Sequence, residues 1–376
     1  MEPSLLAIEK FSAGELDEIL AETEVFWDEL RGEQIFITGG SGFIGGWLLE
    51  TLHHANRRFN LKARATVLTR DPRAFRQSAP HLEAGEVFLL RGDLLDFRMP
   101  AGTFSFVIHA AADVAGRSSH ESAAAVNSWN SLVSGTQRVL EKASAAGAKK
   151  LLFTSSGAVY GSQPPNLPRI AETYQGAPPP AASSSIYGEG KRASEMLCTI
   201  LGQQLGIECK IARIFTTFGP GQPLSSYFAI SNFLADVLES RPPQIKGDGR
   251  PIRSYLYVRD LVTWLWTILF RGVPNDPYNV GSETGISIAE LAQRVAACGE
   301  QSLEAAENVS RVVLSEPAPR YVPDTSKARK ELGLLERIGL DEGIRRTLRW
   351  HRVQRGIDKA EGSQGCALPL SAYKIT

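Results

Sequence analysis

Residues 34–52 read QIFITGGSGFIGGWLLETL, which is a short apolar run, a glycine-rich turn and an apolar-faced helical pattern. This pattern predicts a dinucleotide site, because glycines let backbone N–H groups approach a pyrophosphate and a helix N-terminus carries partial positive charge. The residues expected to form the turn and start the helix beside the cofactor are Gly39, Gly42, Phe43, Ile44 and Gly45. The alternative, an ordinary glycine-rich turn, is disfavoured because the whole strand–turn–helix unit is in register.

The alternation of strands and helices continues beyond this stretch. Further apolar or β-branched runs read RATVLT, EVFLL, FSFVIH, KLLFT and ECKIAR, and helical patterns separate several of them. This order predicts the α/β class, with a Rossmann fold built on a doubly wound parallel sheet. After Arg213 the alternation stops, and Gly/Pro-rich segments such as FGPGQP interleave with helices. We therefore expect a smaller C-terminal α/β cap that binds substrate.

These patterns divide the chain into four expected parts. They are an N-terminal helical extension (1–33, with a helix over 12–30), a Rossmann dinucleotide-binding domain (34–215), a substrate-binding region (216–350) and a tail (351–376). Within the substrate-binding region, residues 255–282 are expected to return in part to the Rossmann domain.

Composition narrows the class of function. The chain has 41 basic and 41 acidic residues, so net charge points neither to nucleic acid nor to an anionic membrane. The most apolar segment, 261–270, is about half the length that a bilayer requires, which predicts a buried core helix. The N-terminus lacks the basic start and apolar run of a signal peptide. Four cysteines without metal or disulfide spacing favour the reduced cytoplasm and predict no metal site: Cys198, Cys209, Cys298 and Cys366.

The end of the second strand bears on which dinucleotide binds. An acidic residue there usually bonds the ribose 2′-OH of NAD, whereas an arginine can accept the 2′-phosphate of NADP. Here Thr69 is followed by Arg70, and Asp71 comes one step later. Arg70 favours NADP, but it could equally stack on the adenine of NAD or be merely solvated, so both cofactors stay open. Other residues expected at the cofactor are Asp93 and Leu94 near the adenine, and Ala110, Ala111 and Ala112 beneath it.

Tyr187 and Lys191 lie four residues apart in SSIYGEGKRASEML, so both side chains share one face of a helix. A phenol is a poor base at neutral pH, but a nearby ammonium and an oxidised nicotinamide stabilise its phenolate. Tyr187 can then take a proton from a hydroxyl as hydride leaves its carbon. A lone Tyr-x-x-x-Lys is most often a chance surface pair. Here Ser155 and Ser156 end a strand at the ligand-binding edge of the sheet, which favours the catalytic interpretation.

Together these motifs resemble a known family. TGGSGFIG, VIHAAA, FTSSGAVYG and YGEGK, in this order, are similar to the extended short-chain dehydrogenase/reductase family, in its NAD-dependent epimerase/dehydratase group acting on nucleotide sugars. Later segments match as well, among them RIFTTFGPGQ, YNVGSETGISIAEL and PDTSKARKELG. The resemblance covers roughly residues 34–350.

The resemblance implies roles for individual residues. Tyr187 is the base, Lys191 activates it and binds the nicotinamide ribose, and Ser156 is the third member of the triad. Ser155 is its neighbour and alternate in binding substrate. Arg253 matches an arginine that grips the substrate diphosphate, a task suited to a bidentate guanidinium.

Three departures from the family pattern matter. Its dehydratases and decarboxylases carry an acidic residue just before the Val-Tyr of the fifth-strand motif, where this chain has Gly157 and Ala158. Elimination of water by a local carboxylate is therefore disfavoured. Thr216, expected to contact substrate, replaces an asparagine that orients the sugar, and Leu132 replaces an asparagine of the fourth crossover helix.

We therefore expect an NAD(P)-dependent enzyme that epimerises a nucleotide sugar through a transient 4-keto intermediate, with NAD bound tightly. An NADPH-dependent ketoreductase of a keto sugar or small carbonyl stays open because of Arg70. So does a dehydratase working with other acids, such as Glu172 or Glu189. The intact triad disfavours a non-catalytic dinucleotide-binding regulator. The family also implies a homodimer through two long helices, here 121–146 and 186–205, and no nucleic-acid or membrane partner is expected.

Overall fold

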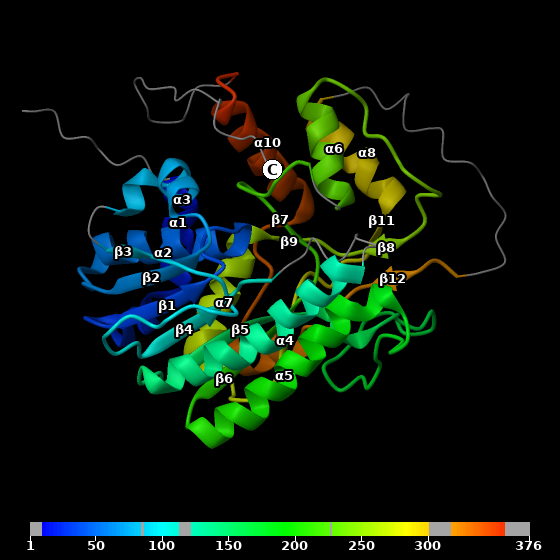
Figure 1. Cartoon of the computed structure of the whole chain (residues 1–376). Coiled ribbons are helices and arrows are strands. Elements are labelled where there is room, and N and C mark those ends of the chain that lie inside the picture. Colours follow the sequence, from blue (N-terminus) through cyan, green and yellow to red (C-terminus); the bar gives the residue numbers. More distant parts are fainter. Residues whose placement is uncertain (1–9, 84–85, 113–121, 226–227, 301–316, 358–376) are drawn as a thin grey trace, which may run out of the picture.

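The computed structural model describes residues 10–83, 86–112, 122–225, 228–300 and 317–357. Its centre is a seven-stranded sheet of order β10-β6-β5-β4-β1-β2-β3, in which all neighbouring strands are parallel (Figure 1). The strands are β1 (Gln34–Thr38), β2 (Arg64–Thr69), β3 (Val87–Arg91), β4 (Phe106–His109), β5 (Lys150–Ser156), β6 (Glu208–Ile214) and β10 (Tyr278–Val280). The predicted α/β fold with a doubly wound parallel sheet is confirmed.

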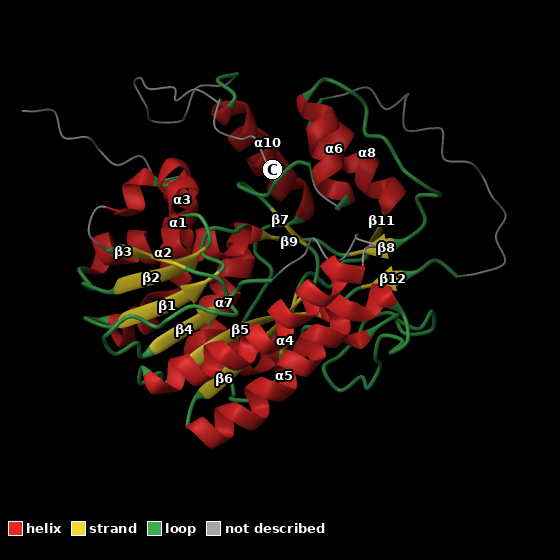
Figure 2. Cartoon of the chain, in the orientation of Figure 1, coloured by secondary structure: helices red, strands yellow, loops and turns green. Residues whose placement is uncertain are grey.

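Helices cover both faces of this sheet, as Figure 2 shows. They are α2 (Phe43–Phe59) and α7 (Val258–Arg271) on one face, and α4 (Ser122–Ala145) and α5 (Ile186–Leu205) on the other, while the short α3 (Pro72–Ser78) joins β2 to β3. Strand β1 explains the two layers, because Ile35 and Ile37 point into one core and Phe36 points into the other. A strand buried on both faces reads as a continuous apolar run, as this one does.

The strand order places the ligand-binding edge of the sheet. From β1 the chain moves outward through β2 and β3, and then returns to β4 on the other side of β1. The carboxyl ends of β1 and β4 therefore form the switch point, where open α/β sheets bind their ligands. The glycine-rich turn at residues 39–45 leaves β1 at this point.

Helix α7 is the segment in which the sequence predicts a core helix. Every residue from Val258 to Phe270 is buried, so the prediction is confirmed. Across the described residues, no helix combines the length and apolarity that crossing a bilayer would take.

The remaining elements form a smaller unit beside the sheet (Figure 1). Its strands are β7 (Thr217–Phe218) paired with β9 (Leu256–Tyr257), and β8 (Ile252–Arg253) paired with β11 (Ile286–Ser287) and β12 (Arg320–Tyr321). Its helices are α6 (Ala229–Leu238), α8 (Ile288–Cys298) and α10 (Leu340–Gln354), and α9 (Ser326–Leu332) lies against β10. Between these elements the chain returns to the large sheet as α7 and β10. The four-part division of the chain stays a prediction.

The N-terminal extension packs on the main body. It consists of α1 (Ala13–Thr23) followed by 3-10 turns (Glu24–Leu30), and Ser12 lies at the N-cap without a side-chain cap hydrogen bond. Just before α1, the ring of Phe11 stacks on Trp47 of α2 with 3.9 Å between centroids. Trp47 Nε1 in turn donates to the Pro220 carbonyl at 2.8 Å. The extension thus lies against the helix after the glycine turn, and Glu15 of α1 accepts a hydrogen bond from the hydroxyl of Tyr257 in the smaller unit at 2.5 Å.

Candidate active site

The glycine turn is packed too closely for side chains at two of its positions. Gly39 has φ +74°, and a Cβ there would lie 2.5 Å from the backbone nitrogen of Ala111. A Cβ on Gly45 would lie 2.2 Å from the Gly39 carbonyl oxygen. The turn therefore fits tightly between the start of α2 and the chain that leaves β4. Because the turn carries no side chains at these positions, a ligand can approach the backbone N–H groups at the start of α2. Such a set of N–H groups is the cradle that a pyrophosphate requires.

We expect Gly39→Ala to weaken dinucleotide binding by about tenfold or more, because both the positive φ and the close backbone contact would strain the turn. Isothermal titration calorimetry with the dinucleotide measures the change. Gly46→Ala is the matched control, since nothing lies within 4 Å of a Cβ at that position of α2. Equal affinities of the two variants would contradict the role given to the turn.

The chain beneath the expected cofactor position is held by His109, the last residue of β4. Its Nδ1 lies 2.7 Å from Thr38 Oγ1 and its Nε2 lies 3.0 Å from Thr136 Oγ1. Burial, with a smaller effect of the Lys191 charge, lowers the pKa of His109 to about 3, so the imidazole is neutral. Thr38 Oγ1 also accepts a hydrogen bond from the Ala111 backbone at 3.3 Å. His109 thus fixes the backbone around Ala111, a role that the sequence analysis did not assign.

The predicted triad residues lie on two adjoining elements, the end of β5 and the start of α5. Lys191 is 1% exposed, and its Nζ donates to the Thr154 carbonyl at 2.6 Å. The ammonium also lies 4.6 Å from the ring centroid of Phe153. Tyr187, one turn earlier, is half-buried. Ser156 ends β5, is 5% exposed and accepts a hydrogen bond from the Ala158 backbone at 3.2 Å.

Ser155, the alternate hydroxyl, has a different environment. Its Oγ donates to Glu195 Oε1 at 2.5 Å, and Glu195 forms a buried ion pair with Arg213 at 2.6 Å between Nη2 and Oε2. The Arg213 Nε donates to the same carboxylate at 3.0 Å, which makes the pair bidentate. Since Ser155 is engaged in this way, the geometry favours Ser156 as the hydroxyl that meets substrate.

The ion pair belongs to a larger polar network. Arg213 Nη1 donates to the Tyr160 hydroxyl at 2.9 Å, and Tyr160 donates to Asn279 Oδ1 at 2.8 Å. Asn279 Nδ2 then donates to the Ile170 carbonyl at 2.8 Å. Burial raises the pKa of Tyr160, so its hydroxyl stays protonated as this network requires. The network joins β5, α5, β6 and β10 directly behind the triad.

Of the two positions before the Val-Tyr, residue 157 has no room for a side chain, while Ala158 is half-buried. A Cβ on Gly157 would lie 2.6 Å from the Tyr321 hydroxyl and 2.7 Å from the ring of Phe215. The two rings lie together, with 4.5 Å between centroids. A carboxylate-bearing side chain therefore has no room at residue 157. Tyr321 comes from β12, and the sequence analysis did not single it out.

The two carboxylates considered for an elimination step already have partners. Glu172 accepts a hydrogen bond from the Asn279 backbone at 2.8 Å, and burial raises its pKa. Glu189 pairs with Arg192 at 3.6 Å on the surface of α5. These contacts place neither carboxylate beside Ser156.

The two further residues expected to bind substrate, Arg253 and Thr216, come from different segments of the chain. Arg253 is half-buried on β8, donates to the Ile252 carbonyl at 3.0 Å and lies 5.9 Å from the Tyr321 ring centroid. Thr216, half-buried between β6 and β7, holds β9 through its carbonyl, which accepts from Leu256 at 3.0 Å. Leu132, at the position of the lost asparagine, packs against Gly190, where a Cβ would lie 2.7 Å from its Cδ1.

Residues expected near the adenosine lie at the ends of β2 and β3. Arg70 is exposed, and the Asp71 carboxylate caps α3 by accepting from the backbone of Arg73 and Ala74 at 3.0 Å each. Asp93 Oδ1 accepts from the Leu95 backbone at 3.1 Å, and Leu94 is buried.

In the part of the chain that the structure describes, no three His, Cys, Asp or Glu side chains gather as a metal ion would require. Cys198, Cys209 and Cys298 are free thiols, and Cys366 lies outside the described residues.

Comparison with known proteins places the chain in a family. The model of the NAD dependent epimerase/dehydratase family matches residues 35–281, so the chain belongs to that family. It is 31% identical over 336 residues to UDP-glucuronic acid decarboxylase 1 of Arabidopsis thaliana, which covers 88% of this chain and 72% of that protein. The predictions of this family and of a nicotinamide-dinucleotide-dependent enzyme are thereby confirmed.

Solved structures share the fold. UDP-glucose 4-epimerase of Thermotoga maritima, solved with UDP-glucose, superimposes with a TM-score of 0.69 at 22% identity, covering 86% of this chain and 99% of that one. UDP-glucuronic acid 4-epimerase of Bacillus cereus, solved with NAD, has a TM-score of 0.69 at 21% identity, covering 87% and 99%. At these identities the likeness establishes the architecture.

Proposed function

We propose that this protein epimerises a nucleotide-linked sugar at C4 by oxidising the hydroxyl transiently and returning hydride to the same carbon. The observation that carries the proposal is the environment of Ser156. The Tyr–Lys helix α5 packs against this end of β5. Gly157 and Ala158, which follow Ser156, carry no carboxylate, and Tyr321 and Phe215 fill the space at residue 157. Oxidation of the hydroxyl and return of the hydride require the Tyr–Lys helix face, and they do not require an acid beside Ser156.

The roles of the side chains follow from their positions. Tyr187 takes the proton of the sugar hydroxyl, and the Lys191 ammonium, anchored on the Thr154 carbonyl, stabilises the phenolate. Ser156 hydrogen-bonds the same sugar oxygen and holds it toward Tyr187. The bound dinucleotide, for which the cradle at Gly39 and Gly45 fits the pyrophosphate, supplies the hydride acceptor and donor.

The reaction balances without net redox change. The O–H proton moves to Tyr187 and the C4 hydride leaves, so the carbon becomes a ketone. After the keto sugar has turned, hydride returns to its other face and Tyr187 gives the proton back to the oxygen. Arg253 is proposed to hold the diphosphate during this turn, because a guanidinium binds phosphate oxygens in a bidentate way.

Decarboxylation is the second candidate, favoured by the likeness to an Arabidopsis UDP-glucuronic acid decarboxylase. Oxidation at C4 of a glucuronate gives a β-keto acid, which loses carbon dioxide without needing an acid beside Ser156. The same residues would then serve for oxidation and for return of the hydride. The substrate decides between the two outcomes.

The test is incubation of the purified protein with UDP-glucose, UDP-glucuronate and dTDP-glucose, followed by NMR of the products and absorbance at the nicotinamide band. We expect the C4 epimer to form with no net absorbance change. A pentose nucleotide with carbon dioxide would instead establish the decarboxylase. Stoichiometric loss of NADPH with keto substrates would establish a reductase. Failure to change any nucleotide sugar would overturn the proposal.

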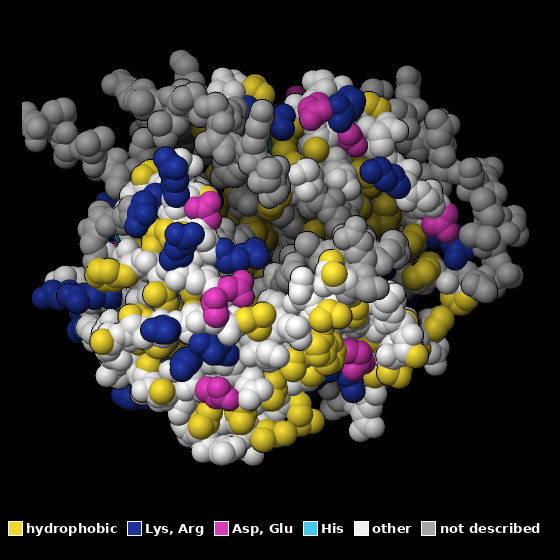
Figure 3. Space-filling model, viewed as in Figure 1, with side chains coloured by type: hydrophobic (Ala, Val, Ile, Leu, Met, Phe, Trp, Pro, Cys, Tyr) yellow, Lys and Arg dark blue, Asp and Glu magenta, His cyan; other side chains and the backbone are white. Residues whose placement is uncertain are grey.

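A homodimer through α4 and α5 is part of the proposal. Large apolar side chains are exposed on these two helices, where Figure 3 shows hydrophobic surface at the lower right: Val126 (58%), Trp129 (39%), Met196 (59%) and Ile200 (53%). Apolar patches of this kind mark association surfaces. Light scattering on the same preparation should give twice the 41.0 kDa of one chain. A cytoplasmic location stays a prediction from the sequence.

A further inference from the structure

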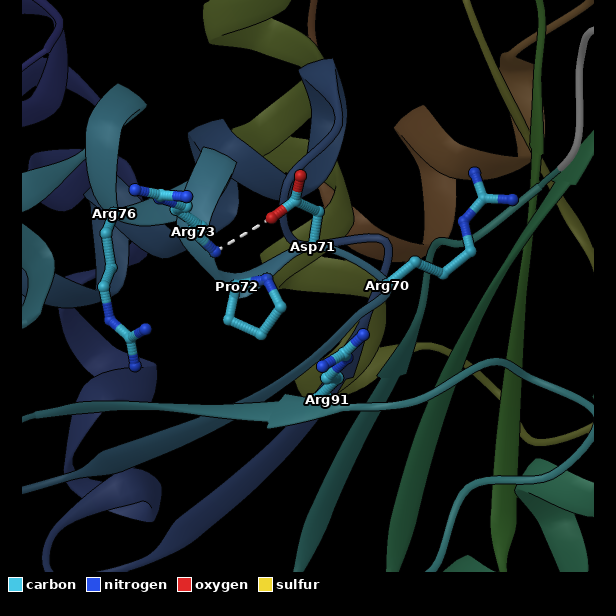
Figure 4. A pocket seen from close by; sticks show the side chains of 6 residues that line it. All are labelled: Arg70, Asp71, Pro72, Arg73, Arg76 and Arg91. Carbon is cyan, nitrogen blue, oxygen red and sulfur yellow. Dashed lines mark hydrogen bonds between the residues drawn. The ribbon is translucent and has the colours of Figure 1, made fainter.

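An arginine-lined pocket lies at the carboxyl ends of β2 and β3 (Figure 4). Its volume is about 490 Å³, and it is lined by Arg70, Asp71, Pro72, Arg73, Arg76 and Arg91. We call this set the arginine pocket. Arg70 directly follows β2 and Arg91 ends β3, while Arg73 and Arg76 belong to α3. Because Thr69 pairs with Arg91 in the sheet register, Arg70 and Arg91 leave neighbouring strand ends.

The pocket gathers four arginines around a single carboxylate. Its one carboxylate, on Asp71, is held by the backbone of Arg73 and Ala74 as the cap of α3. Among the described residues, no acidic side chain forms an ion pair with Arg70, Arg73 or Arg91. All four arginines are exposed, so their guanidinium groups are accessible to a ligand. Figure 4 shows Arg73 and Arg76 on one side of Arg91 and Arg70 on the other. Like charges repel one another, so such a group of cations favours an anion close to them.

The place of the pocket in the fold indicates which anion. The glycine turn at residues 39–45 offers its cradle for the pyrophosphate at the end of β1, and β2 is the neighbouring strand. In this architecture the adenosine ribose reaches the end of the second strand. A ribose 2′-hydroxyl is best bound by a carboxylate, whereas a 2′-phosphate requires several N–H donors. The arginine pocket offers four guanidinium groups as donors, and one oxygen of its single carboxylate is engaged in capping α3.

We propose that the arginine pocket binds the 2′-phosphate of NADP(H), so that this protein prefers the phosphorylated dinucleotide. This proposal rests on the dinucleotide site of the proposed function, but not on the identity of the sugar. Since the hydride returns to the substrate, the phosphorylated and unphosphorylated dinucleotides serve the epimerisation equally well in chemical terms. The pocket then decides which cellular pool of dinucleotide the enzyme uses.

Calorimetric titration with NADP⁺ and NAD⁺ tests the proposal without any turnover. We expect NADP⁺ to bind about tenfold or more tightly than NAD⁺, as charge-assisted hydrogen bonds to one phosphate allow. Adenosine 2′,5′-bisphosphate should compete with NADP⁺, while 5′-AMP and inorganic phosphate at the same concentration should not. Competition by inorganic phosphate alone would show a general anion site and would overturn the proposal.

Single substitutions assign the effect to the pocket. Arg70→Ala and Arg91→Ala should each weaken NADP⁺ binding by about 10- to 100-fold and leave NAD⁺ binding unchanged. Arg58→Ala is the control, because Arg58 is an exposed arginine in the last turn of α2 and lies outside the pocket. Parallel loss of NADP⁺ and NAD⁺ in Arg70→Ala would show stacking on adenine and contradict phosphate binding.

The two proposals fail in different ways. Equal wild-type affinities for NAD⁺ and NADP⁺ would overturn the arginine pocket as a phosphate site and leave the proposed function standing. Binding of neither dinucleotide would overturn both.

Discussion

Replacing Tyr187 with phenylalanine is expected to lower kcat by about 10²- to 10⁴-fold, the usual contribution of a positioned acid–base group. The substitution removes one hydroxyl from a half-buried side chain in the first turn of α5, so the fold should be retained. Dinucleotide affinity should stay close to the wild-type value, because the glycine turn is untouched. Steady-state rates with the substrate found by NMR, together with calorimetric binding, measure the two effects separately.

Tyr174→Phe is the matched control for this substitution. Tyr174 is, like Tyr187, a half-buried tyrosine, but it lies outside the triad, and its loss of a hydroxyl should leave kcat near wild type. If Tyr187→Phe retained full activity while binding both ligands normally, Tyr187 would not be the base. If it lost dinucleotide binding instead, its hydroxyl would have a binding role and the assignment would be wrong.

The features that could be predicted from the sequence are those set by local spacing. The glycines between 39 and 45 occur within one strand–turn–helix unit, and Tyr187 and Lys191 share a helix face because four residues make about one turn. The parallel sheet followed from the regular alternation of strands and helices. In each case the pattern and the structural element occupy the same short stretch of chain.

The features that could not be predicted depend on long-range contacts. Tyr321 meets Gly157 only because β12 pairs with β8 and brings a distant segment to the end of β5. His109 was visible as a residue in VIHAAA, but its role depends on Thr38 in the neighbouring strand and Thr136 in the helix that follows. Arg91 joins Arg70 only through the register of β2 and β3. The spacing of residues along a single sequence does not reveal these long-range pairings.

Glu195 shows how such a long-range contact can decide stability. Replacing Glu195 with alanine is expected to lower the free energy of unfolding by about 3–5 kcal/mol, because it leaves the Arg213 charge buried without its partner. The side chains of Arg213 and Glu195 are only 15% and 11% exposed, and two guanidinium nitrogens bind the carboxylate. Ser155 would lose its acceptor at the same time. Urea unfolding followed by circular dichroism measures the change.

Glu189→Ala on the same helix is the matched control. It removes the same group from a partly exposed pair with Arg192 that is 3.6 Å apart, and such pairs contribute about 0–1 kcal/mol. Glu195→Gln should lose less than Glu195→Ala, since the amide oxygen can still accept hydrogen bonds from Arg213 and Ser155. Similar losses for Glu195→Ala and Glu189→Ala would mean that water replaces the carboxylate beside Arg213. The network behind the triad would then be open to solvent, and Ser155 would not be held by Glu195 as the geometry indicates.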